Sequence, residues 1–433
     1  MQDLSFYLFV GTCAALLLWG LRTPSRIYQY PFLMGGMFTA FLVPQAIGLL
    51  NNPGMVPLES VAQALLMGCL CMAMAWAGYR RRPLHWVLRV EISPLRIERV
   101  YIVGFVISLV SWAAIFGINS IPDEEVRSGT GLFTILAFFS GLSGIAFPVF
   151  LSLAIARPNP GNVAMALVSG YPLYALLMAG RRAGAVAFLI IILLTLFFQK
   201  RWLVPRWLAL GGVLGVAYMI PVIAEMRGEF WSDLLSGNFS AIDWAAPFSK
   251  LLDGDTTLEL RNAAAIVWGT SVTGIYGLGT GYWDAFIFQH VPGQLVGRDL
   301  KDALMFSWTT SVWSEVGYQA TVGSTLTAMG DTYLEFWYFG CLFFFFQGYL
   351  FKNIWYLAVY RNSLIAQLLY MGLMPVTLVS VSHGTYWFIR GAPLVFVAIL
   401  AIHFFAKSRP GGKRLRHARI PLGLSTPSPK RVN

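Results

Sequence analysis

Two consecutive arginines, Arg181 and Arg182, interrupt an apolar stretch of the chain. Arginine is costly near hydrocarbon and tends to mark a functional site when it faces the interior of a helix bundle. Its guanidinium group can also bind two oxygens of one phosphate through parallel hydrogen bonds. The pair therefore predicts an anionic ligand at a membrane surface. The alternative is that both side chains reach lipid headgroups.

His383 lies between the last two apolar runs, and Arg390 lies near the start of the second of them. Imidazole titrates near neutral pH, so His383 is a candidate general base or phosphate donor. Arg390 is expected at the outer end of the last apolar run, on the same membrane surface as Arg181. The structural alternatives are a histidine that caps a helix and an arginine that reaches the membrane surface.

Acidic residues gather at the end of a long stretch that lacks membrane-length apolar runs. Asp331 and Glu335 are four residues apart and would share one face of a helix. An acid at a helix N-terminus is also favoured by the helix dipole, which is the structural explanation. The functional hypothesis is that Asp331 or Glu315 accepts a proton from a sugar hydroxyl. Glu335 falls inside the apolar region, where the structural explanation is weaker.

The same long stretch carries cations and aromatic residues that could bind a glycan. Arg298 and Lys301 follow a segment rich in proline and glycine and lie one helical turn apart, so they are candidates to close over a phosphate. A solvated loop explains them equally well. Many of the aromatic residues would anchor the stretch to the membrane surface. Stacking on sugar rings is the functional alternative for a few, of which Trp283 and Tyr282 are candidates.

Composition excludes a soluble protein. The chain has 433 residues, of which 57% are hydrophobic and only 12% are charged, whereas ordinary soluble domains have about 25% charged residues. A net charge of +11 would suggest nucleic acid in a soluble protein. Here it is explained by basic loops that set membrane orientation, and no nucleic-acid partner is expected. The four cysteines fall in apolar runs and predict neither a disulfide nor a metal site.

Recurring apolar runs predict an all-α polytopic membrane protein with about eleven spans. The first run lacks a basic flank and a cleavage site, so it is predicted to be a retained span and not a signal peptide. The run from 163 to 199 would be a helix of roughly 55 Å, too long for one span, so a hairpin turning at 180–184 is predicted. The expected spans are 4–21, 31–50, 61–79, 101–118, 132–156, 163–179, 184–199, 208–224, 334–351, 363–382 and 387–406.

Charge distribution predicts the orientation. With the C-terminus in the cytoplasm, the inner segments 22–30, 80–100, 157–162, 200–207, 352–362 and 407–433 hold 22 of the 31 Lys and Arg residues but 2 of the 20 acids. This asymmetry is what the positive-inside rule requires, and the opposite orientation would invert it. The prediction is a multi-pass protein of the bacterial cytoplasmic (inner) membrane, with the N-terminus outside.

Four regions follow from these spans. They are an N-terminal bundle of about eight spans (1–224), an extracytoplasmic loop with short helices (225–333), three C-terminal spans (334–406) and a basic cytoplasmic tail that is expected to be disordered (407–433). The predicted cytoplasmic loops contain no Asp-x-Asp pair that would hold the metal of a nucleotide-sugar enzyme. Neither a metal nor a cofactor is therefore expected.

Three motifs resemble those of the bacterial oligosaccharide repeat-unit polymerases, the O-antigen and exopolysaccharide polymerase family. Gly180-Arg181-Arg182-Ala183 is similar to a Gly-Ser-Arg-Gly turn, although Arg181 and Ala183 depart from it. A long external loop carries proline and then basic residues, from Pro292 to Lys301. The entry to the next span resembles a Gly-acid-x-Tyr-x-x-Phe pattern, and the matching residues are Gly330, Asp331, Tyr333, Phe336 and Gly340.

The resemblance implies a GT-C-like membrane glycosyltransferase that acts on glycans linked to undecaprenyl pyrophosphate at the outer face. Arg181, Arg182 and Arg390 would stabilise the pyrophosphate leaving group. His383, Asp331 or Glu315 would accept the proton of the acceptor hydroxyl, while the loop, including Tyr333, would bind glycan. Flippase and chain-length regulator proteins are expected partners. The alternatives are a ligase that moves finished glycan to another acceptor, and a transporter or flippase of precursors.

Overall fold

The computed structural model describes residues 2–121, 132–226, 228–254, 258–307, 312–321 and 325–408, without the side chains of Gln2 and Arg182. Within these ranges every regular element is a helix, and the one extended pairing is an isolated bridge between Leu95 and Lys407. Eleven helical segments there are long and apolar enough to cross a membrane, so the predicted class and number of spans are confirmed. The predicted tail lies outside the described residues from 409 onward.

Each predicted span corresponds to one helix or one interrupted helix. The spanning elements are α1 (Gln2–Leu21), α2 (Tyr30–Met37) with η2 (Phe38–Leu42) and α3 (Val43–Asn51), α4 (Leu58–Arg80), α6 (Ile97–Ile118), α8 (Leu132–Ser140) with α9 (Ser143–Ala156), α10 (Pro160–Met178), α11 (Arg182–Lys200), α12 (Arg206–Met226), α19 (Ala328–Phe336) with η5 (Trp337–Cys341), α20 (Leu342–Trp355) and η6 (Tyr356–Tyr360), α21 (Leu364–His383) and α22 (Tyr386–Ala406).

Shorter helices connect the spans. They are η1 (Pro24–Tyr28), α5 (His85–Arg89), α13 (Gly228–Ser236), α14 (Ala246–Asp253), α15 (Glu259–Thr273), α16 (Thr280–His290), α17 (Gly293–Val296), α18 (Arg298–Ala303) and η4 (Ser314–Val316). Seven of these nine belong to the predicted extracytoplasmic loop. Short helices thus occur in the part of residues 225–333 that the structure describes, while the placement of this segment outside the membrane stays a prediction.

Local signals in the sequence explain where several spans begin. Asn159 caps α10, since its side chain accepts a hydrogen bond from the backbone of Asn162 at 2.8 Å, and Pro160 occupies the first helical position. Ser363 caps α21 in the same way. The hairpin predicted from span length is confirmed, because α10 ends at Met178 and α11 begins at Arg182.

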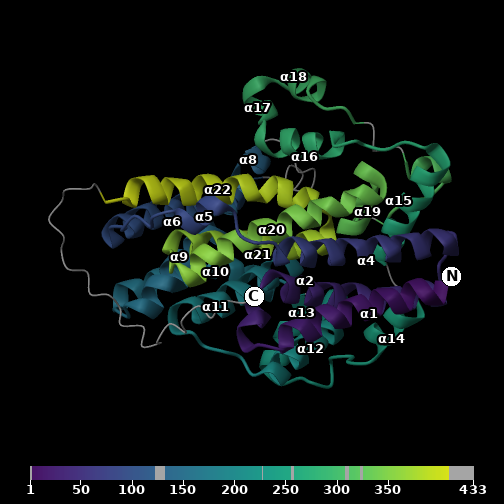
Figure 1. Cartoon of the computed structure of the whole chain (residues 1–433), viewed down its shortest axis with the longest axis horizontal. Coiled ribbons are helices and arrows are strands. Elements are labelled where there is room, and N and C mark those ends of the chain that lie inside the picture. The colour runs from purple at the N-terminus through teal and green to yellow at the C-terminus, as the bar shows by residue number, and fades with distance from the viewer. Residues whose placement is uncertain are drawn as a thin grey trace.

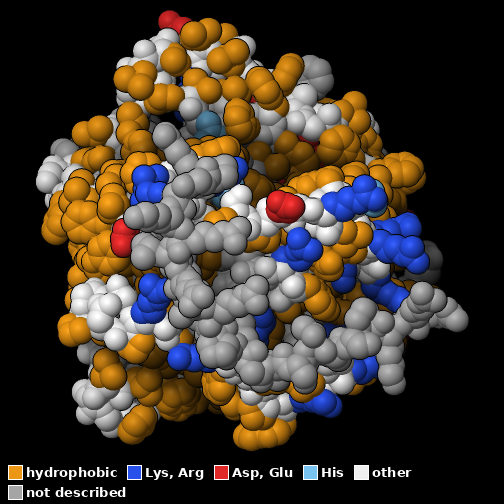
Figure 2. Space-filling model, turned by 60° about the vertical axis from the view of Figure 1, so that its left-hand side comes forward, with side chains coloured by type: hydrophobic (Ala, Val, Ile, Leu, Met, Phe, Trp, Pro, Cys, Tyr) orange, Lys and Arg blue, Asp and Glu red, His pale blue; other side chains and the backbone are white. Residues whose placement is uncertain are grey.

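The segments that connect the spans form two groups at opposite ends of the bundle, and hydrogen bonds join segments within a group. On one end, which we call the basic face, the Tyr28 hydroxyl donates to Trp202 O at 2.8 Å, and the Arg361 side chain donates to Val90 O at 2.7 Å. The Arg96 backbone N–H donates to Ala406 O there as well. These contacts join the segments that the charge count places together. Figure 2 shows Lys and Arg side chains gathered on this side of the molecule.

The other end, which we call the loop face, carries α13 to α18. This segment is spread over several spans: α14 packs on α3, α15 packs between α4 and α19, and α16 packs on α22. Figure 1 shows the hairpin of α16 to α18 projecting above α22, whereas α13 and α14 lie on the opposite side near α1 and α12. The described loop therefore contacts the spans at three separate helices, α14, α15 and α16.

The ninth span begins at Ala328, earlier than the predicted residue 334, and α19 therefore extends into the predicted loop. Both ends of α19 are marked by non-glycine residues in the left-handed region, Thr327 with φ of 58° and Trp337 with φ of 53°. Such conformations cost about 1–3 kcal/mol each and persist only where surrounding contacts impose them. Contacts of the Asp331 and Glu335 side chains hold α19 between these two residues.

Candidate functional site

Two buried carboxylates on α19 form the centre of the candidate site. Asp331 and Glu335 are both 0% exposed. Tyr386, at the start of α22, donates its backbone N–H to Asp331 Oδ2 at 3.2 Å and its hydroxyl to Glu335 Oε1 at 2.6 Å. The prediction that the two acids share one helix face is confirmed, and that face contacts α22.

Asp331 holds the turn between α21 and α22. Its Oδ2 also accepts a hydrogen bond from the Thr385 hydroxyl at 2.8 Å. Gly384 in this turn has φ of 108°, and a Cβ added there would lie 2.9 Å from Asp331 Oδ2, so both conformation and space require glycine. Asp331 Oδ1 is buried and has no hydrogen-bond partner among the described residues. Asp331 is therefore first a positioning residue for α22.

Glu335 holds the segment between α15 and α16. Its Oε2 accepts the backbone N–H of Gly279 at 2.8 Å, and its backbone carbonyl accepts the N–H of Leu278 at 2.8 Å. A Cβ at Gly281 would overlap Glu335 Oε1 and lie 2.6 Å from the Tyr386 hydroxyl oxygen. The absence of a side chain at 281 thus lets the loop approach the carboxylate. We call this contact of α16 with α19 and α22 the seam.

Tyr282 from α16 completes the buried polar network. Its hydroxyl oxygen lies 3.0 Å from the Thr385 hydroxyl, and its ring meets the Tyr386 ring edge-on with centroids 5.4 Å apart. Burial raises the pKa of the Tyr282 phenol well above its usual range, and the carboxylate of Asp331 acts in the same direction. The phenol therefore stays protonated and serves as a hydrogen-bonding group of the seam.

Two of the predicted cations meet at one aromatic ring beside this network. Arg390 lies one turn after Tyr386, and its Cζ stands 5.0 Å from the centroid of Phe288. Lys301 Nζ stands 4.8 Å from the same centroid and donates to the Phe288 carbonyl at 2.9 Å. Both distances are within the range of cation–π attraction. Arg390 Nε is buried and lacks a hydrogen-bond partner within the described ranges.

His290 lies at the end of α16, where its ring contacts Phe138 on the span α8 and Phe286 on its own helix. Its ring centroid lies 5.6 Å from that of Phe138 and 4.7 Å from that of Phe286. Burial lowers the pKa of His290, while the backbone of Ile389 and Arg390 partly opposes this shift. A neutral imidazole follows near neutral pH, so His290 adds no positive charge beside Arg390.

His383 ends α21, two residues before Thr385. Its Nδ1 lies 2.8 Å from the Ser382 hydroxyl, and its ring meets the Trp387 ring edge-on at 5.2 Å. The side chain is half-buried, whereas Asp331 is fully buried. Of the three candidate bases, His383 therefore combines proximity to the seam with access to a ligand. Glu315, the third, is exposed on η4.

The structure places Arg181 apart from this cluster. Its side chain is exposed at the start of α11, and the preceding turn is held by α13, because Trp231 Nε1 donates to Leu177 O at 2.9 Å. Helix α21 packs against both α11 and α22, which lie on opposite sides of it in Figure 1. No contact between Arg181 and the seam occurs among the described residues. The side chain of Arg182 is outside them.

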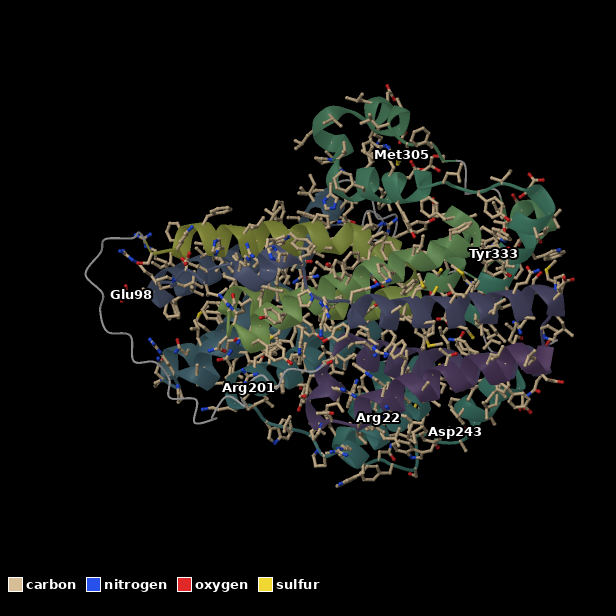
Figure 3. The ribbon with its side chains drawn as sticks, viewed as in Figure 1. Arg22, Glu98, Arg201, Asp243, Met305 and Tyr333 are labelled. Carbon is tan, nitrogen blue, oxygen red and sulfur yellow. The ribbon has the colours of Figure 1, made fainter. Side chains whose placement is uncertain are left out.

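The remaining candidate substrate-binding residues differ in exposure. Arg298 is exposed on α18, and Trp283 is half-exposed while its indole N–H donates to Leu304 O at 2.9 Å. Tyr333 is buried with its ring against Tyr276 and Tyr338. Figure 3 shows Met305 with the projecting hairpin of α16 to α18 and Tyr333 with the helices beneath it. Arg298 and Trp283 are thus the ones open to a ligand.

Sequence reasoning missed the residues that connect the cluster. Tyr386 bonds both acids, Phe288 contacts both cations, and Gly281 admits Glu335 to the loop, yet none was a candidate. One signal was available: a carboxylate inside an apolar run needs donors, and Tyr386 lies beside the candidate His383. Within the described residues, no three His, Cys, Asp or Glu side chains are close enough to hold a metal ion.

Comparison with known proteins adds no relative. No family model matches the chain, and neither a curated protein nor a solved structure matches it. The resemblance to oligosaccharide polymerases therefore stays a prediction that rests on three sequence motifs.

Proposed function

We propose that this chain is a membrane glycosyltransferase that polymerises oligosaccharide repeat units linked to undecaprenyl pyrophosphate, working at the loop face. The observation that carries the proposal is the meeting of Arg390 and Lys301 over Phe288. Their cationic groups come from a span and from the loop, and Arg390 Nε has no partner within the described residues. A pyrophosphate held between membrane and loop is the ligand class that such a pair suits.

The proposed reaction needs two kinds of group. The bond between the anomeric carbon and the pyrophosphate oxygen breaks, and its electron pair stays on the pyrophosphate, where Arg390 and Lys301 neutralise the charge. The hydroxyl oxygen of the acceptor repeat bonds to the same carbon and loses its proton to His383. Asp331 and Glu335 act as positioning residues, since they fix the turn that carries His383 and the helix that carries Arg390.

Loop residues supply glycan recognition in this proposal. Trp283 is half-exposed on the same helix as Phe288, and Arg298 is exposed one turn before Lys301. Both lie on the hairpin that projects above α22 in Figure 1. The exposed Arg181 is proposed to bind a second lipid-linked repeat through its phosphates, because it lies away from the seam.

The test is Arg390→Ala expressed in a polymer-producing bacterium that lacks the wild-type gene. Removing one group that stabilises developing charge lowers turnover by about 100-fold or more. We expect lipid-linked single repeats to accumulate and long polymer to disappear. Lys250→Ala is the matched control, because Lys250 is an exposed loop-face cation that pairs with Glu225 at 3.0 Å. This variant should make polymer of normal length.

Polymer of normal length from Arg390→Ala, at wild-type membrane levels, would refute the pyrophosphate role. Accumulation of long lipid-linked chains would instead indicate a ligase that moves finished glycan. If the protein is a transporter, the inactive variant should leave single lipid-linked repeats at the inner surface of the membrane. Purified protein that elongates lipid-linked repeats without an ion gradient would exclude a transporter.

A further inference from the structure

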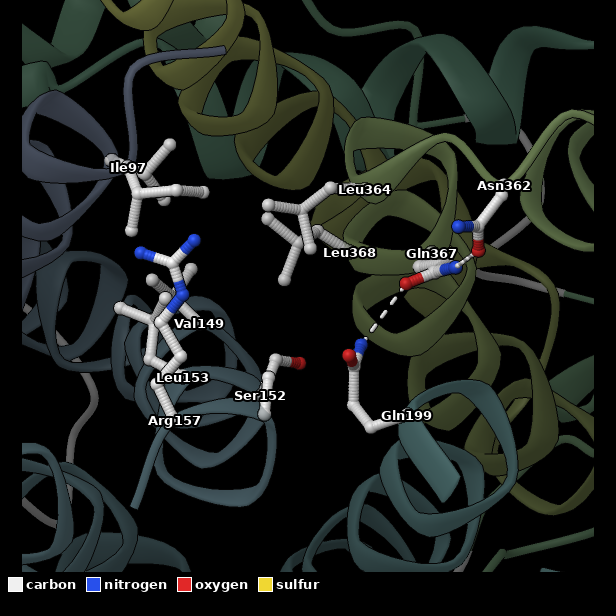
Figure 4. A pocket seen from close by; sticks show the side chains of 12 residues that line it. Ile97, Val149, Ser152, Leu153, Arg157, Gln199, Asn362, Leu364, Gln367 and Leu368 are labelled. Atoms are coloured by element: carbon white, nitrogen blue, oxygen red, sulfur yellow. Dashed lines mark hydrogen bonds between the residues drawn. The ribbon is translucent and has the colours of Figure 1, made fainter. Parts of the chain in front are cut away.

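A second polar site lies at the opposite end of the spans, on the basic face. A cavity of about 160 Å³, open on one side, is lined by the start of α6, the ends of α9 and α11, and the start of α21. Figure 4 shows its lining side chains. These four helix ends belong to the face that carries most basic residues, so the cavity lies at the level of the lipid headgroups of one leaflet.

Polar groups reach this cavity from two sides. The guanidinium group of Arg157 points into it from α9 in Figure 4. On the other side the Gln199 side chain donates to Gln367 Oε1 at 3.0 Å, and the Gln367 side chain donates to Asn362 Oδ1 at 3.1 Å. Gln367 is only 3% exposed. This chain of amides fixes the orientation of the polar wall.

Ser152 adds a hydroxyl group that can bond a ligand in this cavity. Its side chain is 3% exposed, and its hydroxyl oxygen is buried with no hydrogen-bond partner in the part of the chain that the structure describes. Figure 4 shows the Ser152 hydroxyl and the Gln199 amide directed toward the same space. A buried hydroxyl without a partner costs free energy. A ligand with hydrogen-bonding oxygens would satisfy it.

Size and the remaining lining define the ligand. A cavity of about 150 Å³ is enough to bind benzene, so this one can take the phosphate of a ligand with its nearest ester atoms, whereas an oligosaccharide repeat is far too large. Aliphatic side chains complete the wall, among them Val149, Leu153, Leu364 and Leu368. One cation, several neutral polar groups and an aliphatic wall together match a phosphate ester attached to a hydrocarbon chain.

We infer that this cavity binds the headgroup of an anionic phospholipid. Arg157 pairs with the phosphodiester, Ser152 and Gln199 bond the glycerol or ester oxygens, and the first acyl carbons follow the aliphatic side chains. Basic pockets between spans recognise lipid headgroups in this way. The site is separate from the seam, so the inference is independent of the proposed polymerase activity.

The test uses purified full-length protein in detergent, with lipid retention measured by native mass spectrometry and thermal unfolding measured in parallel. Wild-type protein should retain phosphatidylglycerol in preference to phosphatidylcholine and should melt at a higher temperature with it. Arg157→Gln should weaken retention by about tenfold, since it removes a charge-assisted hydrogen bond. Arg157 is exposed, so the variant should fold. Arg82→Gln, another exposed arginine of the same face, is the matched control and should behave like wild type.

Three results would overturn the inference. Equal retention of phosphatidylglycerol by Arg157→Gln and wild type would show that the cavity does not hold the lipid phosphate. Equal retention of phosphatidylcholine by wild type would remove the preference for an anion. Full competition by inorganic phosphate or glycerol 3-phosphate at concentrations similar to those of the lipid would identify a soluble phosphate as the ligand.

Discussion

Two turns on the loop face each contain a glycine and each precede a helix with a candidate arginine near its start, but they are held in different ways. The turn between α10 and α11 has Gly180 with φ of 68° and ends at the exposed Arg181. A hydrogen bond from the Trp231 indole to Leu177 O, at the end of α10, joins it to the loop. The turn between α21 and α22 has Gly384 with φ of 108° and is enclosed by α16 and α19.

The two turns differ in how far along the chain the residues that hold them lie. The turn at Gly384 depends on Asp331, Tyr282 and Glu335, which are 51 to 103 residues away. Substitutions in those distant segments should therefore disturb Arg390. The turn at Gly180 should respond mainly to changes in its own residues. A conspicuous local motif is thus a poor guide to which arginine belongs to a built site.

The largest effect on stability is expected for Glu335→Ala. It leaves two half-buried donors, the Tyr386 hydroxyl and the Gly279 N–H, without their acceptor. A fully buried orphaned donor costs about 1–3 kcal/mol, and partial exposure favours the lower end of that range, so the free energy of unfolding should fall by about 2–3 kcal/mol in total. Thermal unfolding of purified protein measures this. Arg181→Ala, at the exposed turn, should change stability by less than about 0.5 kcal/mol.

A double-mutant cycle sharpens this comparison. Tyr386→Phe removes the donor that bonds Glu335 Oε1, so its effect and that of Glu335→Ala should be less than additive. Additive losses would contradict a coupled pair. A loss in Arg181→Ala as large as that in Glu335→Ala would contradict the difference between the two turns.

An intermediate effect is expected for Gly281→Ala, which adds a Cβ that overlaps Glu335 Oε1. Overpacking costs about 1–3 kcal/mol, and it should loosen α16 from the spans before the bundle unfolds. Limited proteolysis of the hairpin of α16 to α18 measures this loosening. The control is Gly293→Ala in the same hairpin, because a Cβ there would meet the Lys301 side chain at an ordinary 3.4 Å. Equal proteolysis of the two variants would argue against close packing at residue 281.

Local and short-range features of the structure followed from the sequence. Eleven apolar runs gave the eleven spans, and the excessive length of the run from 163 to 199 gave the hairpin at Gly180. The spacing of Asp331 and Glu335 gave their shared face. These predictions succeeded because they depend on the periodicity of one helix or on the thickness of a bilayer.

The seam could not be predicted in the same way. Arg390 meets Phe288, and Glu335 meets Gly279 and Gly281, across 54 to 102 residues of chain. No periodicity relates such pairs, because the path of the loop over the spans decides them. Tyr282 illustrates the consequence. Its place among aromatic residues of the loop predicts a ring that stacks on sugar. In the structure its hydroxyl lies beside Thr385 and its ring packs against Tyr386.

The smallest effect expected is a pH dependence at the outer edge of the seam. Burial lowers the pKa of His290 below its unfolded value of about 6.5. The unfolded chain therefore binds the proton more readily, and the stability that neutral His290 contributes is lost as pH falls below about 6.5. On α22, His290 meets the backbone of Ile389 and Arg390, and Arg390 is the charged residue of that pair. On α8 it meets Phe138, which carries no charge. Protonation should loosen α16 from both spans.

Thermal unfolding of wild type and His290→Phe at pH 7.5, 6.5 and 5.5 tests this expectation. The melting temperature of wild type should fall between pH 6.5 and 5.5 more steeply than that of His290→Phe. His85→Phe is the matched control, because His85 is exposed on the basic face and should keep the wild-type pH dependence. Identical slopes for wild type and His290→Phe would mean that another group sets the pH response. The seam would then owe its stability to the buried carboxylates of α19 and the aromatic rings alone.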